Sequence, residues 1–325
     1  MSVWELHRRV MEDYREFVRS YVNIHDPRLR EFAEKILEEK ELWPPPLIQL
    51  SPTYREAETL AELAEKGLIH PETARIFGLR LKESRLWQHQ VEGIALAQRG
   101  QDFVVTSGTG SGKTLCFLVP IVDAVVRNPG IRGPIAFLIY PTNALVNSQL
   151  AALQDLAQAY REKFGRDFPV SFARYTGETE EPEREKVRAH PPHILLTNYV
   201  MVELMMVRPE DRPLLEPKAP PEVPFFLVFD ELHTYRGRQG ADVAMLVRRL
   251  RARIGRERIV HIGTSATMVA HHRDSPAERR RAVAEFASRF FGRRIPPENV
   301  VEETLSQISL GGPPSPEELR TALSK

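Results

Sequence analysis

The amino-acid sequence predicts an α/β fold with a mainly parallel sheet between helices, preceded by an N-terminal helical extension. From about residue 86, short apolar runs alternate with stretches of helical spacing. This alternation is typical of a parallel sheet whose strands are buried on both faces. Residues 1 to about 80 instead show helical spacing that is interrupted by proline-rich joins, which predicts helices without a sheet.

Composition places the chain among soluble globular proteins and excludes several kinds of site. The 325 residues are 42% apolar and 27% charged, with a formal net charge of +1, so any nucleic-acid binding must come from local patches. A single cysteine, Cys116, excludes an internal disulfide framework and a cysteine-based metal site. No signal region is visible, and no apolar run approaches the roughly 20 residues of a membrane span. We expect a cytoplasmic protein without a membrane partner.

Two amphipathic helices are predicted in the extension, over residues 3–22 and 28–39. The stretch LWPPPLIQLSPTY (42–54) then breaks the regularity, because proline supplies no N–H to a helix or a strand ladder. Helical spacing resumes over residues 56–77. The apolar residues of the first helix recur at helical spacing, namely Trp4, Val10, Met11, Tyr14, Phe17, Val18 and Tyr21.

Apolar runs and helical stretches alternate through the rest of the chain. The predicted strands are residues 102–106, 134–140, 170–176, 193–197, 225–230 and 259–265, and the predicted helices are 113–126, 142–163, 198–206 and 240–254. The proline-dense stretch 208–224 predicts an exposed loop, and 311–316 resembles a linker. We expect an extension over 1–80, a sheet domain over 81–305 and a linker or tail over 306–325.

The stretch TSGTGSGKTL (106–115) predicts a phosphate-binding loop, because it follows a predicted strand and opens a predicted helix. Backbone N–H groups of such a loop surround phosphates, Lys113 would neutralise their charge, and the Thr114 hydroxyl would bind Mg²⁺. Ser107 stands where the general pattern has glycine, and the alternative is a glycine-rich turn without a ligand. The expected nucleotide-binding residues are Ser107, Gly108, Thr109, Gly110, Ser111, Gly112, Lys113 and Thr114.

A second acidic site is predicted in FFLVFDELHTY, where an apolar strand runs directly into Asp230 and Glu231. Asp230 at the strand end would hold Mg²⁺, and Glu231 would polarise the attacking water as general base. The alternative is that the acidic pair caps the following segment. A phosphate loop in the same sheet favours the catalytic interpretation.

The ordered motifs TSGTGSGKT, DELH and GTSAT, each at the end of a predicted strand, resemble motifs of superfamily 2 helicases, the DEAD/DEAH-box-like motor ATPases. YPTNALVNSQ (140–149), YTGE (175–178), LLTNYVM (195–201) and LWQHQ (86–90) resemble further motifs of that family. The resemblance covers about residues 85 to 305 and implies the first RecA-like, ATP-binding domain of such a protein. It implies ATP and Mg²⁺ as cofactors.

The resemblance also assigns roles to single residues. It implies a catalytic set of Lys113, Asp230, Glu231 and His233, with Thr114 and Asp230 on the magnesium. Gln90 would read the N6/N7 edge of adenine through its amide, although a surface glutamine on a helix is the alternative. The residues that link hydrolysis to movement would be Ser265, Ala266 and Thr267. His233 has no second ligand at metal spacing and is not expected to bind a metal.

Small polar residues follow three predicted strands, and on a parallel sheet these strand ends share one edge. Such side chains and free backbone N–H groups suit sugar–phosphate contacts without base readout. The alternative for each threonine or asparagine is ordinary helix capping. The expected nucleic-acid contacts are Pro141, Thr142, Asn143, Thr176, Gly177, Thr197 and Asn198.

The arginine-rich stretch after motif II predicts a helix with one apolar face. Arginines on its other side are either a solvated face or a contact for a subunit or nucleic acid. YRGRQGADV (235–243) is also similar to a subgroup of large bacterial helicases of repair and phage defence. The pair His271–His272 is expected to be solvated. The expected core face is Ala241, Ala244, Met245, Val247, Leu250 and Ile254.

The family's motor has two RecA-like lobes, and too few residues follow GTSAT for a second one. We therefore expect a first lobe that hydrolyses ATP poorly by itself and whose partners are a second RecA-like lobe, nucleic acid and possible further subunits. The expected function is an ATP-dependent helicase or translocase acting on DNA in preference to RNA. The alternatives are an ATP-gated clamp without productive unwinding and a phosphate-loop enzyme acting on small molecules.

Overall fold

The computed structural model describes residues 2–21, 24–39, 53–82, 84–108, 110–266 and 275–306. The predicted tail (from 307 on), Thr109, Thr267 and the pair His271–His272 lie outside them. The chain divides into two compact units, Met1–Ser51 and Pro52–Lys325, so residues 52–80, which the sequence analysis grouped with the extension, belong to the sheet unit. Among the described helices, none combines the length and apolarity needed to cross a membrane.

The first unit contains the two predicted helices, α1 (Val3–Tyr21) and α2 (Pro27–Glu39). Ser2 and Glu5 begin α1 with reciprocal bonds, Glu5 N–H to Ser2 Oγ at 3.2 Å and Ser2 N–H to Glu5 Oε2 at 2.7 Å. This is the pairing of a capping box. Large apolar side chains of α1 are exposed, with Phe17 at 56% and Tyr21 at 75%.

A seven-stranded sheet with the order β5-β6-β4-β7-β8-β3-β9 forms the centre of the second unit, and each of its pairings is parallel. The strand that carries the phosphate loop (β3) therefore lies beside the strand of the GTSAT motif (β8), whose other neighbour (β7) carries the acidic pair. The strands are β3 (Phe103–Thr106), β4 (Ala136–Tyr140), β5 (Phe172–Arg174), β6 (Ile194–Asn198), β7 (Phe225–Phe229), β8 (Ile259–Ser265) and β9 (Val300–Glu302). The six predicted strands are confirmed.

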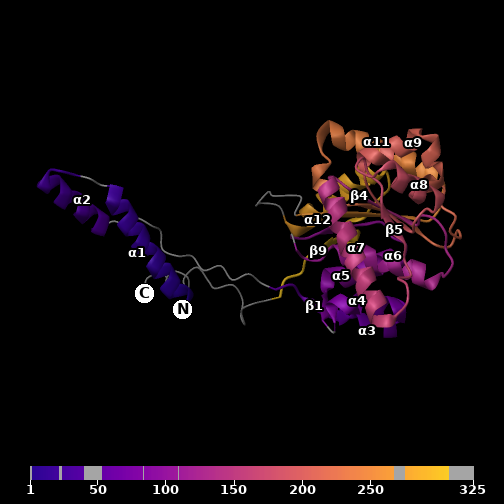
Figure 1. Ribbon diagram of the computed structural model, residues 1–325, viewed down its shortest axis with the longest axis horizontal. Helices are drawn as coiled ribbons and strands as arrows, with labels where there is room; N and C mark the ends of the chain where they lie inside the picture. The colour runs from indigo at the N-terminus through magenta and orange to yellow at the C-terminus, as the bar shows by residue number, and fades with distance from the viewer. Residues whose placement is uncertain are drawn as a thin grey trace. The chain divides into compact units, whose positions relative to one another are not determined.

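Helices cover both faces of this sheet (Figure 1). On β4, Leu138 and Tyr140 belong to one hydrophobic core, and Phe137 and Ile139 belong to the other, as the period of two in a strand requires. The first core contains residues of α3 (Leu60–Glu65), α4 (Pro71–Leu81), α5 (Gln88–Gln98), α6 (Thr114–Arg127) and α7 (Asn143–Phe164). The second contains residues of α8 (Glu181–Ala189), α9 (Tyr199–Val207), α10 (Arg212–Leu215), α11 (Gly237–Ile254) and α12 (Pro276–Phe291).

Residues 56–59 form a strand, so the predicted helical spacing over 56–77 is wrong at its start. This strand, β1 (Glu56–Thr59), pairs antiparallel with β2 (Arg85–Trp87). The helical pattern is correct only from Leu60, where Thr59 accepts the Glu62 N–H at 3.2 Å and caps α3. A pairing partner about 28 residues away overrides the local preference.

The proline-dense stretch 208–224 exposes many of its residues, as predicted, but it also contains short helices and buried side chains that the prediction of a plain loop did not include. It contains a 3₁₀ turn (Pro209–Asp211) and α10, and Leu214 and Leu215 are fully buried. The Arg256 guanidinium donates to the carbonyls of Ala219, Pro220 and Val223. Carbonyls that no strand or helix uses are thereby satisfied by one side chain.

The predicted core face of α11 is only half correct. Val247, Leu250 and Ile254 are buried, whereas Ala241 and Met245 are exposed and Ala244 is partly buried. The helix is rotated so that Gly240, Val243 and Leu246 enter the core in their place.

The arginines of α11 bind other parts of the same unit. Arg249 pairs with Glu203 of α9, and Arg251 donates to the Phe291 carbonyl of α12 at 3.2 Å. These contacts connect α11 to α9 and α12, and the side chain of Arg249 is still 48% exposed.

Candidate nucleotide and nucleic-acid site

The phosphate loop joins the end of β3 to the start of α6, as predicted. Gly110 and Gly112 have φ angles of +79° and +74°, a backbone region that glycine adopts without the cost of a side chain. The Lys113 ammonium donates to the carbonyls of Ser107 at 2.9 Å and Gly108 at 3.1 Å, and the Ser107 and Ser111 hydroxyls lie 2.5 Å apart. The loop thus holds the Lys113 ammonium through its own carbonyl groups.

Gln90 supports this loop from α5. Its buried side-chain amide donates to the carbonyls of Ser111 at 3.2 Å and Gly112 at 3.3 Å, and its oxygen accepts the Trp87 N–H at 2.9 Å. Both amide donors are therefore used, and one lone pair on the oxygen remains for a ligand. His89 also reaches the Ser111 carbonyl, at 3.0 Å, and burial lowers its pKa.

Asp230 directly follows the fully buried strand β7, and its backbone N–H donates to the Ile139 carbonyl at 2.9 Å. Burial raises the pKa of Asp230, and the nearby charge of Glu231 raises it further. The hydrogen bond from the Thr264 hydroxyl and the positive charge of Lys113 act in the opposite direction and lower this pKa. The Lys113 charge acts on Asp230 because the strands of both residues flank β8.

Glu231 has a φ of +52°, which is uncommon for a residue other than glycine and is often found at functional sites. Its N–H donates to Thr264 Oγ1 at 3.2 Å, so one buried hydroxyl holds both acidic residues. The carboxylate does not cap the 3₁₀ turn that follows (Leu232–Thr234). The capping alternative for Glu231 is therefore excluded.

His233 joins the acidic pair to the end of β8. Its Nδ1 lies 3.1 Å from Glu231 Oε2 and 3.2 Å from Ser265 Oγ. The Ser265 hydroxyl also donates to the Ala266 carbonyl at 2.6 Å. A continuous polar chain therefore runs from Glu231 to the GTSAT segment.

Some of the expected nucleic-acid contacts already serve in the fold itself. The Thr142 hydroxyl caps α7 and the Asn198 amide oxygen caps α9, so the capping alternative is confirmed for both. Thr197 is buried and donates to the Tyr175 carbonyl at 2.7 Å, and Thr176 is buried as well.

The structure does bring the three expected segments together at one edge. Asn198 Nδ2 donates to Asn143 Oδ1 at 2.7 Å, and Asn143 Nδ2 donates to Glu178 Oε1 at 2.9 Å. Hydrogen bonds from Asn143 and Asn147 lower the pKa of Glu178. Gly177 is exposed, and Pro141 and Asn143 are partly exposed, so backbone groups and amides remain accessible there.

Two residues beside the phosphate loop were missed from the sequence. The Glu303 carboxylate accepts the Gly108 N–H at 2.7 Å. Tyr54 lies tilted to the Trp87 ring and edge-on to the His89 ring, with ring centroids 5.6 Å and 5.5 Å away. The segments of Tyr54 and Glu303 are linked by the Arg55 N–H, which donates to the Thr304 carbonyl at 2.7 Å. No local pattern marks either residue, because their pairing spans most of the chain.

The residues present fit a nucleoside triphosphate with magnesium. Side chains at Gly110 and Gly112 would be strained at their positive φ angles, and a glycine-rich loop of this kind lets backbone N–H groups approach phosphates. Thr114 and Asp230 would supply two oxygen ligands, which would suit Mg²⁺ because it usually combines one or two protein ligands with phosphates and water. Among the described residues, no group of three or more His, Cys, Asp or Glu side chains could hold a metal without such a ligand.

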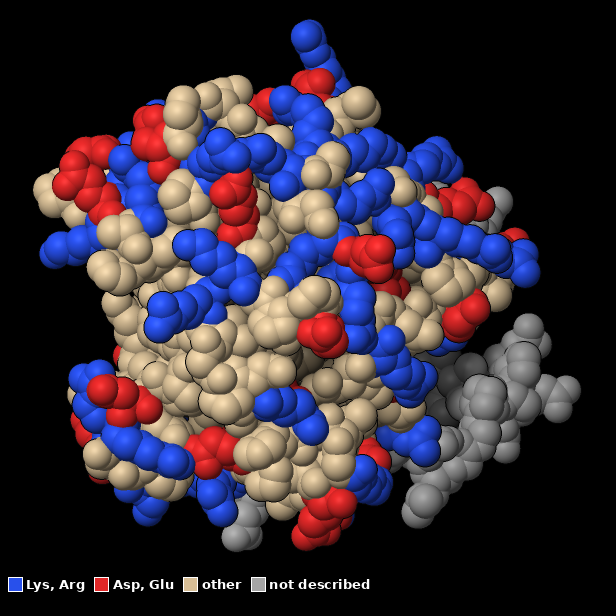
Figure 2. Space-filling view, turned by 90° about the vertical axis from the view of Figure 1, so that its right-hand side faces the viewer, with Lys and Arg blue, Asp and Glu red and all other residues tan. Residues whose placement is uncertain are grey.

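Lysine and arginine side chains gather on the side of the sheet unit where Figure 1 shows α8 and α9 (Figure 2). Basic residues stand in the last turns of α6, α7, α8, α11 and α12. Cations there stabilise the negative end of each helix dipole. Basic residues at helix ends therefore need no nucleic acid to explain them, and the polar edge of Asn143, Glu178 and Asn198 stays the candidate interface.

Comparison with known proteins agrees with this geometry. Residues 87–274, more than half of the chain, match the family described as DEAD/DEAH box helicase. The chain is 28% identical to the Druantia protein DruE of Escherichia coli (strain UMEA 4076-1), over 80% of this chain and 20% of that protein. It is 33% identical to the uncharacterized ATP-dependent helicase YprA of Bacillus subtilis (strain 168), over 56% of this chain and 23% of that protein.

A solved structure of the DUF1998 helicase MrfA bound to DNA is similar with a TM-score of 0.60 and 25% identity, covering 78% of this chain and 31% of that one. The chain thus spans about a fifth to a quarter of the length of the curated relatives named above.

Proposed function

This chain belongs to the DEAD/DEAH box helicase family, and we propose that it is the first RecA-like lobe of a nucleic-acid-dependent ATPase. The ATPase would couple hydrolysis to movement on, or unwinding of, nucleic acid. The observation that carries the proposal is the shared edge of the sheet, where the phosphate loop follows β3 and Asp230 and Glu231 follow β7, the two strands that flank β8. Fold alone would not support it, because one fold serves many activities.

At this edge the chain's own residues would divide the work of hydrolysis. Lys113 and the N–H groups of the loop would hold the phosphates, and Thr114 and Asp230 would hold Mg²⁺. The ion, when bound, neutralises charge that develops on the phosphate oxygens. Glu231 would accept a proton from the attacking water, since its backbone conformation and the bond to Thr264 fix its position.

Gln90 would contact fewer atoms of adenine than the N6/N7 edge that the sequence predicts. Its remaining lone pair could accept the amino group of adenine. Its donors are occupied by the loop, so pairing with the N7 acceptor of adenine would require a rearrangement.

His233 would link the nucleotide to movement, because it lies between Glu231 and Ser265. A change at Glu231 could reach the GTSAT segment through this imidazole. Pro141, Asn143 and Gly177, which follow β4 and β5, would offer contacts to the sugar–phosphate backbone of the nucleic acid. DNA is preferred to RNA in this proposal because the similar helicase MrfA has been solved with DNA.

We propose that the working motor is cytoplasmic. A second RecA-like lobe would complete its nucleotide site. An arginine finger supplied by such a lobe contributes about 10³–10⁵ in rate. This chain by itself would therefore bind Mg·ATP weakly and hydrolyse it very slowly. We also propose the boundaries 1–80 and 81–305 as the limits of extension and lobe, with residues 52–80 packed on the lobe.

The proposal is tested by ATP turnover of the longer protein that carries this chain, with and without single-stranded DNA or RNA of the same sequence. Stimulation by DNA that disappears in Glu231→Gln is the expected result. Nucleotide-dependent DNA binding without turnover would instead establish an ATP-gated clamp. ATP turnover that neither DNA nor RNA stimulates would contradict the proposal.

A further inference from the structure

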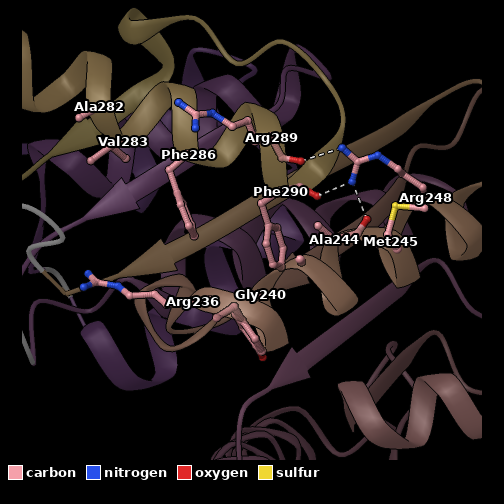
Figure 3. A pocket seen from close by; sticks show the side chains of 13 residues that line it. Arg236, Gly240, Ala244, Met245, Arg248, Ala282, Val283, Phe286, Arg289 and Phe290 are labelled. Carbon is pink, nitrogen blue, oxygen red and sulfur yellow. Dashed lines mark hydrogen bonds between the residues drawn. The ribbon is translucent and has the colours of Figure 1, made fainter.

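A groove of about 810 Å³ lies between α11 and α12 (Figure 3). Its floor is apolar, with Ala241, Ala244 and Met245 from α11 and Phe286 and Phe290 from α12. It is called the α11–α12 groove below. Apolar surface of this kind on a soluble domain commonly marks an interaction site.

Helix α11 carries two apolar faces, whereas a surface helix normally has one. One face, which includes Val243 and Leu246, is buried in the core. The other face contains Ala241, Ala244 and Met245, and Met245 is 58% exposed. The fold leaves this second face without a covering element among the described residues.

The rim of the groove is basic. Arg236, Arg248 and Arg289 line it, and no Asp or Glu is among its described lining residues. Arg248 donates to backbone carbonyls of both helices, at 2.6 Å to Ala244, 2.7 Å to Arg289 and 3.3 Å to Phe290 (Figure 3). Among the residues that the structure describes, no carboxylate pairs with the Arg248 guanidinium. Within the same part of the chain, Arg289 pairs with the exposed Glu285 alone, at 3.2 Å, and such pairs are weak.

The shape of the groove suits a helix. Gly237, Ala241 and Ala244 follow one another at four- and three-residue spacing along α11, and their small side chains let another helix axis come close. Met245 of α11 and Phe286 of α12 line the same groove (Figure 3) and would enter the spaces between side chains of that helix. Apolar anchors at i, i+3 or i+4 and i+7 are the usual way in which a helix binds such a groove.

We propose that the α11–α12 groove binds an amphipathic helix of a partner protein, one whose apolar face is flanked by acidic residues. The acidic flanks would pair with the arginine rim, and the apolar face would cover Met245 and Phe286. The occupant would also touch Tyr235, which lines the groove two residues after His233. A bound partner could therefore act on the segment that carries the acidic pair.

The test uses three fluorescent synthetic peptides of equal length with the same leucine–alanine face, flanked by Glu, Gln or Lys, and a single-stranded oligonucleotide. Fluorescence anisotropy measures their binding to the whole chain. Three variants are compared with wild type, namely Met245→Asp in the floor, Arg289→Glu in the rim, and Arg249→Ala as the matched control outside the groove. Circular dichroism confirms that each variant folds.

The expected result is binding of the Glu-flanked peptide about tenfold or more above the Lys-flanked one. Met245→Asp should abolish this binding, Arg289→Glu should shift the preference toward Lys flanks, and Arg249→Ala should change neither. Equal binding of the three peptides, or none up to about 1 mM, would overturn the proposal. Oligonucleotide binding that Met245→Asp removes would also overturn it and make the groove a nucleic-acid surface. ATP takes no part in this assay, so its failure would leave the proposed ATPase untouched.

Discussion

Replacing Thr264 with valine tests how the magnesium ligand is held. The Thr264 hydroxyl donates to Asp230 and accepts the Glu231 N–H at 3.2 Å, and Thr264 is fully buried. Valine keeps the shape of the side chain and removes both bonds. A hydrogen bond to a charged group contributes about 1.5–3 kcal/mol, which corresponds to roughly 10- to 150-fold in an equilibrium constant.

We expect Thr264→Val to weaken Mg·ATP binding by that factor and to shift its pH dependence. Burial already raises the pKa of Asp230, and loss of the Thr264 bond, which lowers it, would raise it further. Mg²⁺ binds the ionised carboxylate, so affinity is high above this pKa and falls as the pH falls through it. In Thr264→Val the fall should begin at a higher pH.

Isothermal titration of the chain with Mg·ATP between about pH 4 and 8, a range that extends upward from the ordinary aspartate pKa of about 3.9, measures both effects. Thr264→Ser keeps the hydroxyl and is the matched control, and titration with ATP and EDTA isolates the contribution of the metal. Wild-type affinity and an unchanged pH profile in Thr264→Val would refute the reasoning.

Three further substitutions test other contacts. Asp230→Asn should abolish Mg²⁺-dependent ATP binding without lowering the melting temperature, because a buried charge is removed; a clear loss in thermal unfolding would contradict this. The Asp102 carboxylate accepts the His261 N–H at 2.8 Å, and although burial alone would raise the pKa of Asp102, its bonds to His261 lower it overall. Its stabilisation is therefore present above the unfolded pKa of about 3.9 and lost as the pH falls through the folded value. Asp102→Asn should lower the free energy of unfolding, measured in urea, by about 1.5–3 kcal/mol at neutral pH and by progressively less in acid. An equal loss at every pH would show that ionisation of Asp102 is not coupled to folding. Gly263→Ala should destabilise the fold by about 1–3 kcal/mol, because the added Cβ would overlap the Leu232 side chain. Adding Leu232→Ala should restore part of the lost stability. An unchanged melting curve in Gly263→Ala would show that Leu232 can move aside.

The parts of the site that the sequence could predict are local ones. Strands buried on both faces read as apolar runs, and polar residues that follow such a run lie at the strand end. Asp230 and Lys113 were placed in this way, and the parallel sheet brings them to one edge.

Other parts depend on distant pairings that leave no local pattern. Thr264 reads as one more polar residue of GTSAT until β8 is paired with β7, and Glu303 reaches the phosphate loop only because β9 pairs with β3. The face that α11 turns to the core could not be chosen from spacing, since both of its faces are apolar. The structure shows that the second face borders the α11–α12 groove.

The claim on which the account depends most is that this chain carries an Mg·ATP site at the phosphate loop. Titration of Mg·ATP into the chain and into Lys113→Ala tests it, with Lys163→Ala, an exposed lysine of α7, as the matched control. We predict measurable binding that Lys113→Ala weakens by about tenfold or more, since a charge-assisted contact to phosphate is lost, and that Lys163→Ala leaves unchanged. Equal affinity in all three proteins would contradict the account.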